Sequence, residues 1–490
     1  MNKKVTILPG TPDDNNRDYL PEIIKTTDVV VNENGNNSQV YPERLTEYTG
    51  VIADGIEDTW YEYVPESYDP SKKTPLVFSM HGGMMTGWGQ AIYTSWTMVA
   101  DRDGFILVFP NSSSGRFWTV EWDKAKLEKG LEPGLHPTPS SPGENHDNRL
   151  VLGLLDLMKS KYNIDEGRVF MQGMSMGDMM TNQFARNFGN LLAGAAGSGA
   201  AVGRGLLYDG DGKIINRGGP LAIWQSRPEL NGFPDDLKLN RYNREYWLSI
   251  NGCKSLPEIS IQGENNLAFY SGERADLVYL DIKNRDHGQT LDDAGLVWDY
   301  FFSGTRREQG GSIVHTGTVA PRVGDSFAVA IAKDCSTAWF KNSVIGMSGP
   351  AIKWQKLKYH GLNGGQEVRG EYLCVPLSFI AEVFDAEYTP SEDTLSAALI
   401  LKDGRELQFA RGSIGCAVDN RITSMLCEAL HRNGELYISF EWFCRSICNL
   451  HVSVCENVLY ATDHYSVLSA NMADLINDIL KGAERIFLLF

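Results

Sequence analysis

The chain lacks any apolar run long enough to cross a membrane. A spanning helix needs roughly 20 predominantly apolar residues, and no segment of the 490 residues approaches that length. The first ten residues contain two lysines but no apolar stretch that could form the core of a signal peptide. We therefore expect a protein without a membrane span that is cytoplasmic by default, or secreted if a signal segment has been removed.

Basic residues are also in short supply. Lysine and arginine together number 45 against 62 aspartates and glutamates, so the formal net charge is −17. Nucleic acids and anionic membranes both require a basic face, and neither is expected as the main partner. The composition, 42% hydrophobic and 22% charged, is typical of a soluble globular protein. The length exceeds one ordinary core, which predicts two or more domains.

Cysteine is almost absent from the first 300 residues, where Cys253 stands alone. Among the later cysteines, Cys444 and Cys448 have the i, i+4 spacing of one helix face. That spacing suits either a metal pair or two small buried hydrophobic side chains. No second cysteine pair or histidine pair stands at zinc-site spacing. We therefore predict no metal site and no cofactor.

The pattern along the chain predicts an α/β domain over residues 46–304. Residues 1–45 form a polar segment with little periodicity, and residues 60–64 then alternate like a half-buried strand. Short apolar runs typical of buried strands follow at 76–80, 105–109, 169–171, 221–224 and 277–280, with helical stretches between them such as 149–162 and 178–187. Alternating strands and helices predict a mostly parallel sheet with helices on both faces.

The pattern changes near residue 305. Residues 305–312 are polar and glycine-bearing, which predicts a linker, and residues 313–490 form a second domain. Within it, residues 375–382 and 438–445 share an apolar pattern, and the segments 341–344 and 419–422 both look like hairpin turns. We predict a smaller α+β domain made of two hairpin-helix repeats.

Residues 173–177 read Gly-Met-Ser-Met-Gly, a G-x-S-x-G pentapeptide. It follows a predicted strand and precedes a predicted helix. In that context the serine sits on a tight, strained turn with its hydroxyl above the sheet, and the glycines let neighbouring backbone approach. A chance Gly/Ser turn is the alternative, but the strand and the helix favour Ser175 as a nucleophile.

An oxyanion hole is predicted from two segments. His81-Gly82-Gly83 follows the strand at 76–80, and acyl transfer needs backbone N–H groups that stabilise the developing negative charge. One donor is the residue after the nucleophile, Met176, and the other is Gly83 or Met84. His81 itself is expected to be structural.

The base is predicted to be His287. It alone among the histidines before residue 300 follows a buried strand and precedes a helix. The acid should lie on the loop after the strand at 221–224. Glu229 is nearest the strand end and is the predicted acid, with Asp235 and Asp236 as alternatives. For each of these carboxylates a plain surface position is the competing interpretation.

Residues about 50–303 resemble the polyhydroxybutyrate-depolymerase/feruloyl-esterase-like group of α/β-hydrolases. The motifs that carry the resemblance are residues 75–77 running into 81–83, 168–170 into 173–177, 246–248 with 251–253, and 286–288 before an aromatic helix. The resemblance implies an α/β-hydrolase fold and a serine carboxylesterase that forms an acyl-enzyme on Ser175. Its substrate would be a small or polymeric ester, whether aromatic, acetyl-sugar or polyester.

The chain departs from that family at two places. Asp178 stands where the family often has a second glycine, and Arg227-Pro228-Glu229-Leu230-Asn231 replaces its usual His-Gly-x-x-Asp. Asn231 therefore stands where the family has its aspartate. This keeps open a non-catalytic binding or scaffold protein on a degenerate hydrolase fold. Peptidase or acyltransferase chemistry on the same residues is also open, because fold analogy does not decide function.

Residues about 311–465 resemble the copper-amine-oxidase N-terminal-like domain, a stalk module of multidomain proteins from Gram-positive bacteria. The resemblance rests on residues 375–382 and their degenerate second copy. It implies no copper and no oxidase chemistry. It implies instead a role in protein or cell-wall contact or in dimerisation. Such modules usually lie outside the cell, which conflicts with the missing signal peptide.

Overall fold

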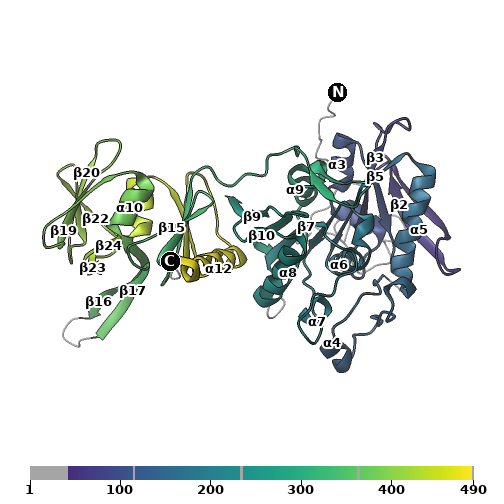
Figure 1. Ribbon diagram of the computed structural model, residues 1–490, viewed down its shortest axis with the longest axis horizontal. Coiled ribbons are helices and arrows are strands. Elements are labelled where there is room, and N and C mark those ends of the chain that lie inside the picture. Colours follow the sequence, from purple (N-terminus) through teal and green to yellow (C-terminus); the bar gives the residue numbers. More distant parts are fainter. Residues whose placement is uncertain (1–41, 114–115, 232–235, 361–364, 488–490) are drawn as a thin grey trace, which may run out of the picture. The chain divides into compact units, whose positions relative to one another are not determined.

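The computed structural model describes residues 42–113, 116–231, 236–360 and 365–487. The chain divides into two compact units (Figure 1). The first contains Met1–Ser255 and Phe269–Arg322, and the second contains Leu256–Ala268 and Val323–Phe490. No helix among the described residues is long and apolar enough to span a membrane.

The first unit is built on a large mixed sheet. Within this unit the strand order is β1-β2-β4-β3-β5-β6-β7-β10, whereas β8 and most of β9, which continue the sheet beyond β10, belong to the second unit. The strands from β4 to β10 in this order pair in parallel, and β1 and β2 add an antiparallel edge. The bounds are β1 Leu45–Val51, β2 Glu57–Tyr63, β3 Thr74–Met80, β4 Ile106–Pro110, β5 Ile164–Met174, β6 Gly194–Ser198, β7 Ala222–Leu230, β8 Glu258–Gln262, β9 Asn265–Tyr270 and β10 Leu277–Asp286.

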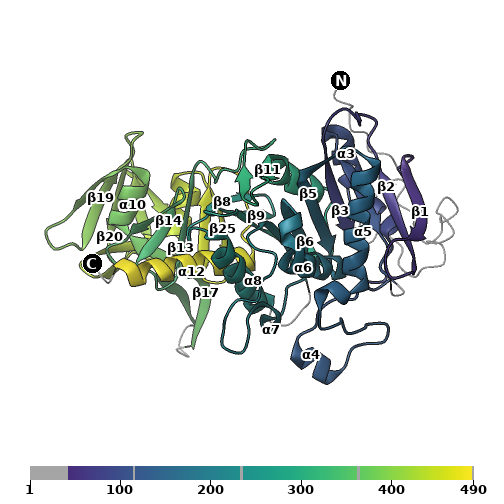
Figure 2. The same ribbon diagram turned by 45° about the vertical axis from the view of Figure 1, so that its right-hand side comes forward.

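Helices cover this sheet because its central strands are apolar on both faces. Every residue of β3 and β4 is buried, which is the pattern of parallel strands with helices on either side. Figure 2 shows α5 and α6 beside β5 and β6. The helices are α2 Gly87–Tyr93, α3 Trp96–Asp103, α4 Lys124–Lys129, α5 His146–Lys161, α6 Met176–Phe188, α7 Arg204–Leu207, α8 Asp236–Asn251 and α9 Asp293–Tyr300. The strand order, with the parallel core and the strand-turn-helix at β5–α6, is that of an α/β-hydrolase, which confirms the predicted fold of this part.

The predicted linker is instead a small hairpin. β11 (Thr305–Arg307) pairs antiparallel with β12 (Ile313–His315). Arg306 forms an ion pair with Asp165 at 2.7 Å, and Arg307 Nε donates to the carbonyl of Leu192 at 2.6 Å. These side chains satisfy polar groups of the first unit, so the hairpin belongs to that unit. A polar, glycine-bearing segment at the end of a domain can therefore form a turn that packs on that domain, and not only a linker.

In the part of the second unit that the structure describes, residues 323–490 contribute three small sheets and three helical segments. Strand orders are β15-β14-β13-β26-β25, β16-β17-β24-β23 and β18-β19-β20-β21-β22. The strands are β13 Ala328–Ala332, β14 Thr337–Phe340, β15 Ser343–Gly346, β16 Ile352–His360, β17 Gly365–Pro376, β18 Glu387–Pro390, β19 Ser396–Ile400, β20 Glu406–Ala410, β21 Gly415–Val418, β22 Arg421–Ser424, β23 Leu430–Arg432, β24 Glu435–Ser439, β25 His451–Cys455 and β26 Val458–Thr462. The helical segments are α10 Leu377–Phe384, α11 Phe440–Trp442, which continues as a π-helix over Phe443–Ile447, and α12 Ala470–Phe487.

Strand β17 ends in α10 and β24 ends in α11, and the two strand ends pair with Val375 opposite Ile438. Both segments predicted as hairpin turns do connect paired strands. The β14–β15 turn has φ of 47° and 61° at Lys341 and Asn342. The β21–β22 turn has φ of 47° and 62° at its two central residues. Positive φ at both central positions is the tight turn that fits the strand twist. That the unit is an internal repeat stays a prediction.

Candidate active site

Ser175 lies on a strained turn between β5 and α6. Its φ of 56° and ψ of −118° place it outside the ordinary regions for a residue with a side chain. The flanking glycines are sterically required. A Cβ on Gly173 would lie 2.1 Å from the carbonyl oxygen of Gly177, and one on Gly177 would lie 2.2 Å from that of Met80. The turn therefore lifts the hydroxyl above the sheet, as a nucleophile elbow requires.

His287 reaches the serine from the end of β10. Its Nε2 lies 2.7 Å from Ser175 Oγ, which is hydrogen-bond distance. Burial lowers the pKa of His287 below its ordinary value, and the charge of Asp286 opposes that shift. The ring is therefore neutral at neutral pH and can accept the serine proton.

The partner of the other ring nitrogen is Asn231. Its Oδ1 lies 2.6 Å from His287 Nδ1, and its Nδ2 donates to the carbonyl of Gly199 at 3.2 Å. Because the amide nitrogen faces a carbonyl, the amide oxygen faces the ring. Nδ1 must then carry the hydrogen, which leaves the Nε2 lone pair for Ser175.

Glu229 is not at this place, and its predicted role as the acid is wrong. Its carboxylate accepts from Lys283 Nζ at 2.8 Å and from the backbone N–H of Asn284 at 3.2 Å. The reason lies in β7, which runs to Leu230 instead of ending near Trp224. The loop therefore starts two residues after Glu229. Of the alternatives, Asp235 and the side chain of Asp236 lie outside the described residues.

The turn at residues 82–84 contains two of the predicted oxyanion donors. Met84 has a φ of 67° and donates its N–H to the carbonyl of Arg116 at 2.9 Å, so Gly83 is the better of the two predicted donors. A Cβ on Gly83 would lie 3.6 Å from the Met176 sulfur, which places this turn beside the start of α6. The N–H of Met176 belongs to the first turn of that helix, where backbone donors have no helical partner.

His81 holds this turn in place. It is fully buried, its Nε2 accepts from the N–H of Ser112 at 3.0 Å, and its Nδ1 lies 2.7 Å from the carbonyl of Gly82. Burial lowers the pKa of His81 to about 4. A neutral ring with both nitrogens occupied is a structural element, and no proton transfer is assigned to it.

A pocket of about 320 Å³ lies along α6. Trp122, Met179, Val202 and Leu206 contribute its apolar lining. Met179 is one helical turn after Ser175. Trp88, Trp96, Trp118 and Trp224, in contrast, are buried in the core.

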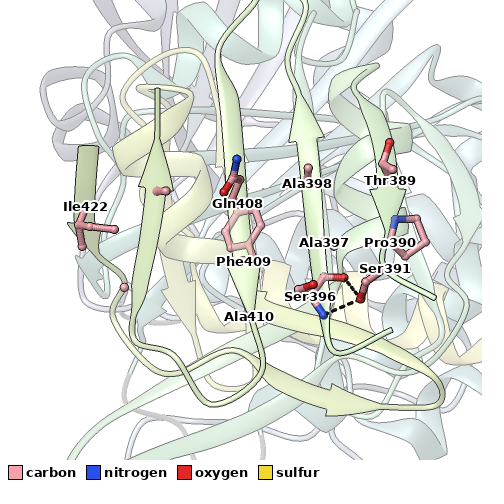
Figure 3. Close-up of a pocket in the computed structure, with 12 residues that line it drawn as sticks. Thr389, Pro390, Ser391, Ser396, Ala397, Ala398, Gln408, Phe409, Ala410 and Ile422 are labelled. Atoms are coloured by element: carbon pink, nitrogen blue, oxygen red, sulfur yellow. Dashed lines mark hydrogen bonds between the residues drawn. The ribbon is translucent and has the colours of Figure 1, made fainter. Parts of the chain in front are cut away.

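The second unit has a larger hollow of about 490 Å³ on the sheet β18–β22 (Figure 3). Its lining consists of small and uncharged residues such as Ala398, Gln408 and Ala417. None of these lining residues is a histidine, a carboxylate or a cysteine. Among the described residues of the chain, no cluster of three or more histidine, cysteine, aspartate or glutamate side chains could hold a metal.

Comparison with known proteins identifies esterases as relatives. No protein-family model matches the chain. Acetylxylan esterase A of Talaromyces purpureogenus is 29% identical over 175 residues, which is 35% of this chain and 41% of that protein. Feruloyl esterase B of Thermothelomyces thermophilus is 29% identical over 147 residues, 29% of this chain and 44% of that protein. Among solved structures, an acetyl xylan esterase from Aspergillus awamori aligns with a TM-score of 0.38 and 19% identity, covering 53% of this chain and 98% of the other. The chain spans less than half the length of these two curated relatives. Over about a third of its length, it is therefore similar in sequence to acetylxylan and feruloyl esterases.

Proposed function

We propose that this protein is a serine carboxylesterase that uses Ser175 as its nucleophile and His287 as its base. The observation that carries the proposal is the 2.7 Å contact between Ser175 Oγ and His287 Nε2 on a nucleophile elbow. The similarity to acetylxylan and feruloyl esterases supports an acetylated or feruloylated sugar as the substrate.

The chemistry proceeds through an acyl-enzyme. Ser175 attacks the ester carbonyl while His287 Nε2 takes its proton, and the N–H groups of Met176 and Gly83 hold the oxyanion. His287 then gives the proton to the leaving alcohol as the carbon–oxygen bond breaks. Water, activated by the same histidine, attacks the acyl-enzyme and releases the acid and the free serine.

Asn231 fills the third position without a charge. A triad carboxylate both fixes the tautomer of the histidine and stabilises the imidazolium, and an amide in its place can cost about 10⁴ in rate when the wrong tautomer results. Here the amide oxygen faces Nδ1, so the correct tautomer is kept. The proposed enzyme lacks charge stabilisation from this residue but keeps the orientation.

Labelling with a fluorophosphonate tests the nucleophile. The wild-type chain should bind one equivalent at Ser175, and Ser175→Ala should bind none. Replacing His287 by Ala should slow labelling, whereas the exposed His136→Ala serves as a matched control that leaves it unchanged. Rates on p-nitrophenyl acetate, acetylated xylan oligomers and methyl ferulate then identify the acyl group.

A non-catalytic binding protein is the second candidate, and the uncharged Asn231 beside His287 is the observation that favours it. Absence of both label and turnover in folded wild-type protein would establish this alternative. The contact or dimerisation role of the second unit stays a prediction.

A further inference from the structure

A fully buried ion pair lies beside the proposed site. Asp178 lies in the first turn of α6, just after Ser175. Arg227 lies on β7, shortly before Asn231 in the sequence. Arg227 Nη1 lies 3.2 Å from Asp178 Oδ2, and both side chains have no exposed surface. These are two of the positions at which the chain departs from the family that it resembles.

Asp178 is held on three sides. Besides Arg227, it accepts from Asn182 Nδ2 at 2.5 Å and from the backbone N–H of Ala200 at 2.9 Å. There is no free space around it, because a Cβ on Gly197 would lie 1.8 Å from Asp178 Oδ1. Burial raises the pKa of Asp178 to about 6, against the attraction of Arg227.

Arg227 is fixed just as firmly. Its Nε donates to Asn240 Oδ1 at 2.7 Å, and its Nη1 also donates to the carbonyl of Ser226 at 3.0 Å. Its Nη2 is buried and has no acceptor among the residues that the structure describes. Burying two charges costs several kcal/mol per ion, and a hydrophobic pair often stabilises a fold as well. Stability alone is therefore a weak reason for this arrangement.

The pair fixes the turn at residues 198–200, and this turn meets all three proposed site residues. The carbonyl of Ser198 accepts from the N–H of Ser175 at 2.7 Å. Gly199 has a φ of +83°, and a Cβ on it would lie 3.4 Å from the ring of His287. The Gly199 carbonyl accepts from Asn231 Nδ2.

An asparagine needs such support in a way that a carboxylate does not. An amide has one accepting and one donating end. If Asn231 were flipped, its nitrogen would donate to Nδ1 and force the hydrogen onto Nε2. His287 would then point a donor at Ser175 and could not act as its base. A carboxylate accepts with either oxygen and has no wrong orientation.

We propose that the Asp178–Arg227 pair is a positioning device for the base. It fixes the turn at residues 198–200 so that the Gly199 carbonyl holds the Asn231 amide with its oxygen toward His287. The pair thereby selects the histidine tautomer that can deprotonate Ser175. This inference rests on the proposed esterase function and deepens it.

A double-mutant cycle tests the device. Asp178→Asn should lower kcat on p-nitrophenyl acetate by about a hundredfold, the size of effect that a small misplacement produces, with a much smaller change in KM. In the Asn231→Asp background the same change should cost less than about threefold, because the two sites are then no longer coupled. Equal losses in both backgrounds would overturn the proposal. Glu62→Gln is the matched control, since it removes another buried carboxylate, which lies on β2 near the edge of the sheet and pairs with Lys161 at 2.8 Å. This change should alter stability but not kcat.

Two further measurements keep the outcomes distinct. Fluorophosphonate labelling of the wild type reports the esterase function itself. A wild-type protein that neither reacts with the label nor hydrolyses an ester would refute the esterase function, and not only the role of the Asp178–Arg227 pair. If Asp178→Asn does not fold, nitrogen-15 NMR of the wild-type chain decides the question. At a pH above the pKa of His287, the imidazole signals of this residue should show the hydrogen on Nδ1. A hydrogen on Nε2 would overturn the proposal.

Discussion

Replacing Asn231 by aspartate should make the enzyme faster. The new carboxylate would face Nδ1 of His287, where the amide oxygen now lies at 2.6 Å. Its charge attracts the imidazolium that forms as Ser175 attacks, but not the neutral ring of the resting state. The interaction therefore favours the transition state and raises kcat.

The magnitude follows from which state each effect acts on. At an effective dielectric constant of about 20, opposite charges about 4 Å apart attract by about 4 kcal/mol, and this attraction exists only once the imidazolium forms. The substitution also removes the donor that Asn231 Nδ2 now offers to the Gly199 carbonyl at 3.2 Å. Leaving that oxygen unpaired costs about 1–3 kcal/mol in the resting enzyme and in the transition state alike, so it lowers stability and not kcat. The gain of about 4 kcal/mol predicts a rise in kcat of up to about a thousandfold.

The pH profile provides a second readout. Activity requires neutral His287, and burial lowers the pKa of that ring below the ordinary 6.5, so the wild-type enzyme should stay active at a pH below this value. A neighbouring carboxylate favours the protonated ring and raises its pKa. The acid limb of kcat/KM in Asn231→Asp should therefore move to higher pH.

The assay is kcat/KM on p-nitrophenyl acetate from acidic to alkaline pH, with Asn231→Ala measured alongside. An unchanged rate and an unmoved acid limb in Asn231→Asp would show that Asn231 is not the working partner of Nδ1. If Asn231→Asp lost as much kcat/KM as Asn231→Ala, the hydrogen bond to the Gly199 carbonyl would matter more at position 231 than the interaction with the His287 ring.

Three further predictions concern Glu229, Trp122 and the β11–β12 hairpin. Glu229→Gln should change kcat by less than about threefold, because Glu229 pairs with Lys283 and not with His287. The lost hydrogen bond should instead cost about 1–3 kcal/mol of stability. Thermal unfolding and kcat measured together separate the effect on stability from the effect on rate, and a large loss of kcat would restore Glu229 as a site residue. Trp122→Ala should raise KM for methyl ferulate more than for p-nitrophenyl acetate, because Trp122 lines the pocket beside α6; equal changes for both esters would show that the aryl group binds elsewhere. A chain ending at Gly304 should melt at a lower temperature than one ending at Arg322, because it lacks the hairpin whose Arg306 pairs with Asp165; identical melting curves would show that the hairpin adds nothing to the first unit.

The sequence by itself determined the parts of this protein that depend on local chemistry. The strands β3 and β4, which are apolar except for Thr74 and Ser79, predict a covered parallel sheet, since burial on both faces explains such runs. The elbow was equally readable, because only glycine tolerates the contacts at positions 173 and 177. The predictions of Ser175 and His287 followed from chain order and context, and the structure brings these two residues together.

Other features depended on contacts between distant segments. Strand β6 has the sequence Gly-Ala-Ala-Gly-Ser, which lacks the branched residues typical of strands. It forms because its neighbours β5 and β7 offer their backbone groups and because Gly197 leaves room for Asp178. No local pattern predicts such a strand.

The third site residue was decided in the same way. Counting along the loop favours Glu229, but pairing with β10 extends β7 as far as Leu230 and turns Glu229 toward Lys283. That extension delivers Asn231 to the ring of His287 instead. Likewise, Asp178 and Arg227 are separate departures in the sequence and one ion pair in the fold. Which side chain meets which across a sheet depends on register and strand length, and these are set by the backbone hydrogen bonds of the whole sheet.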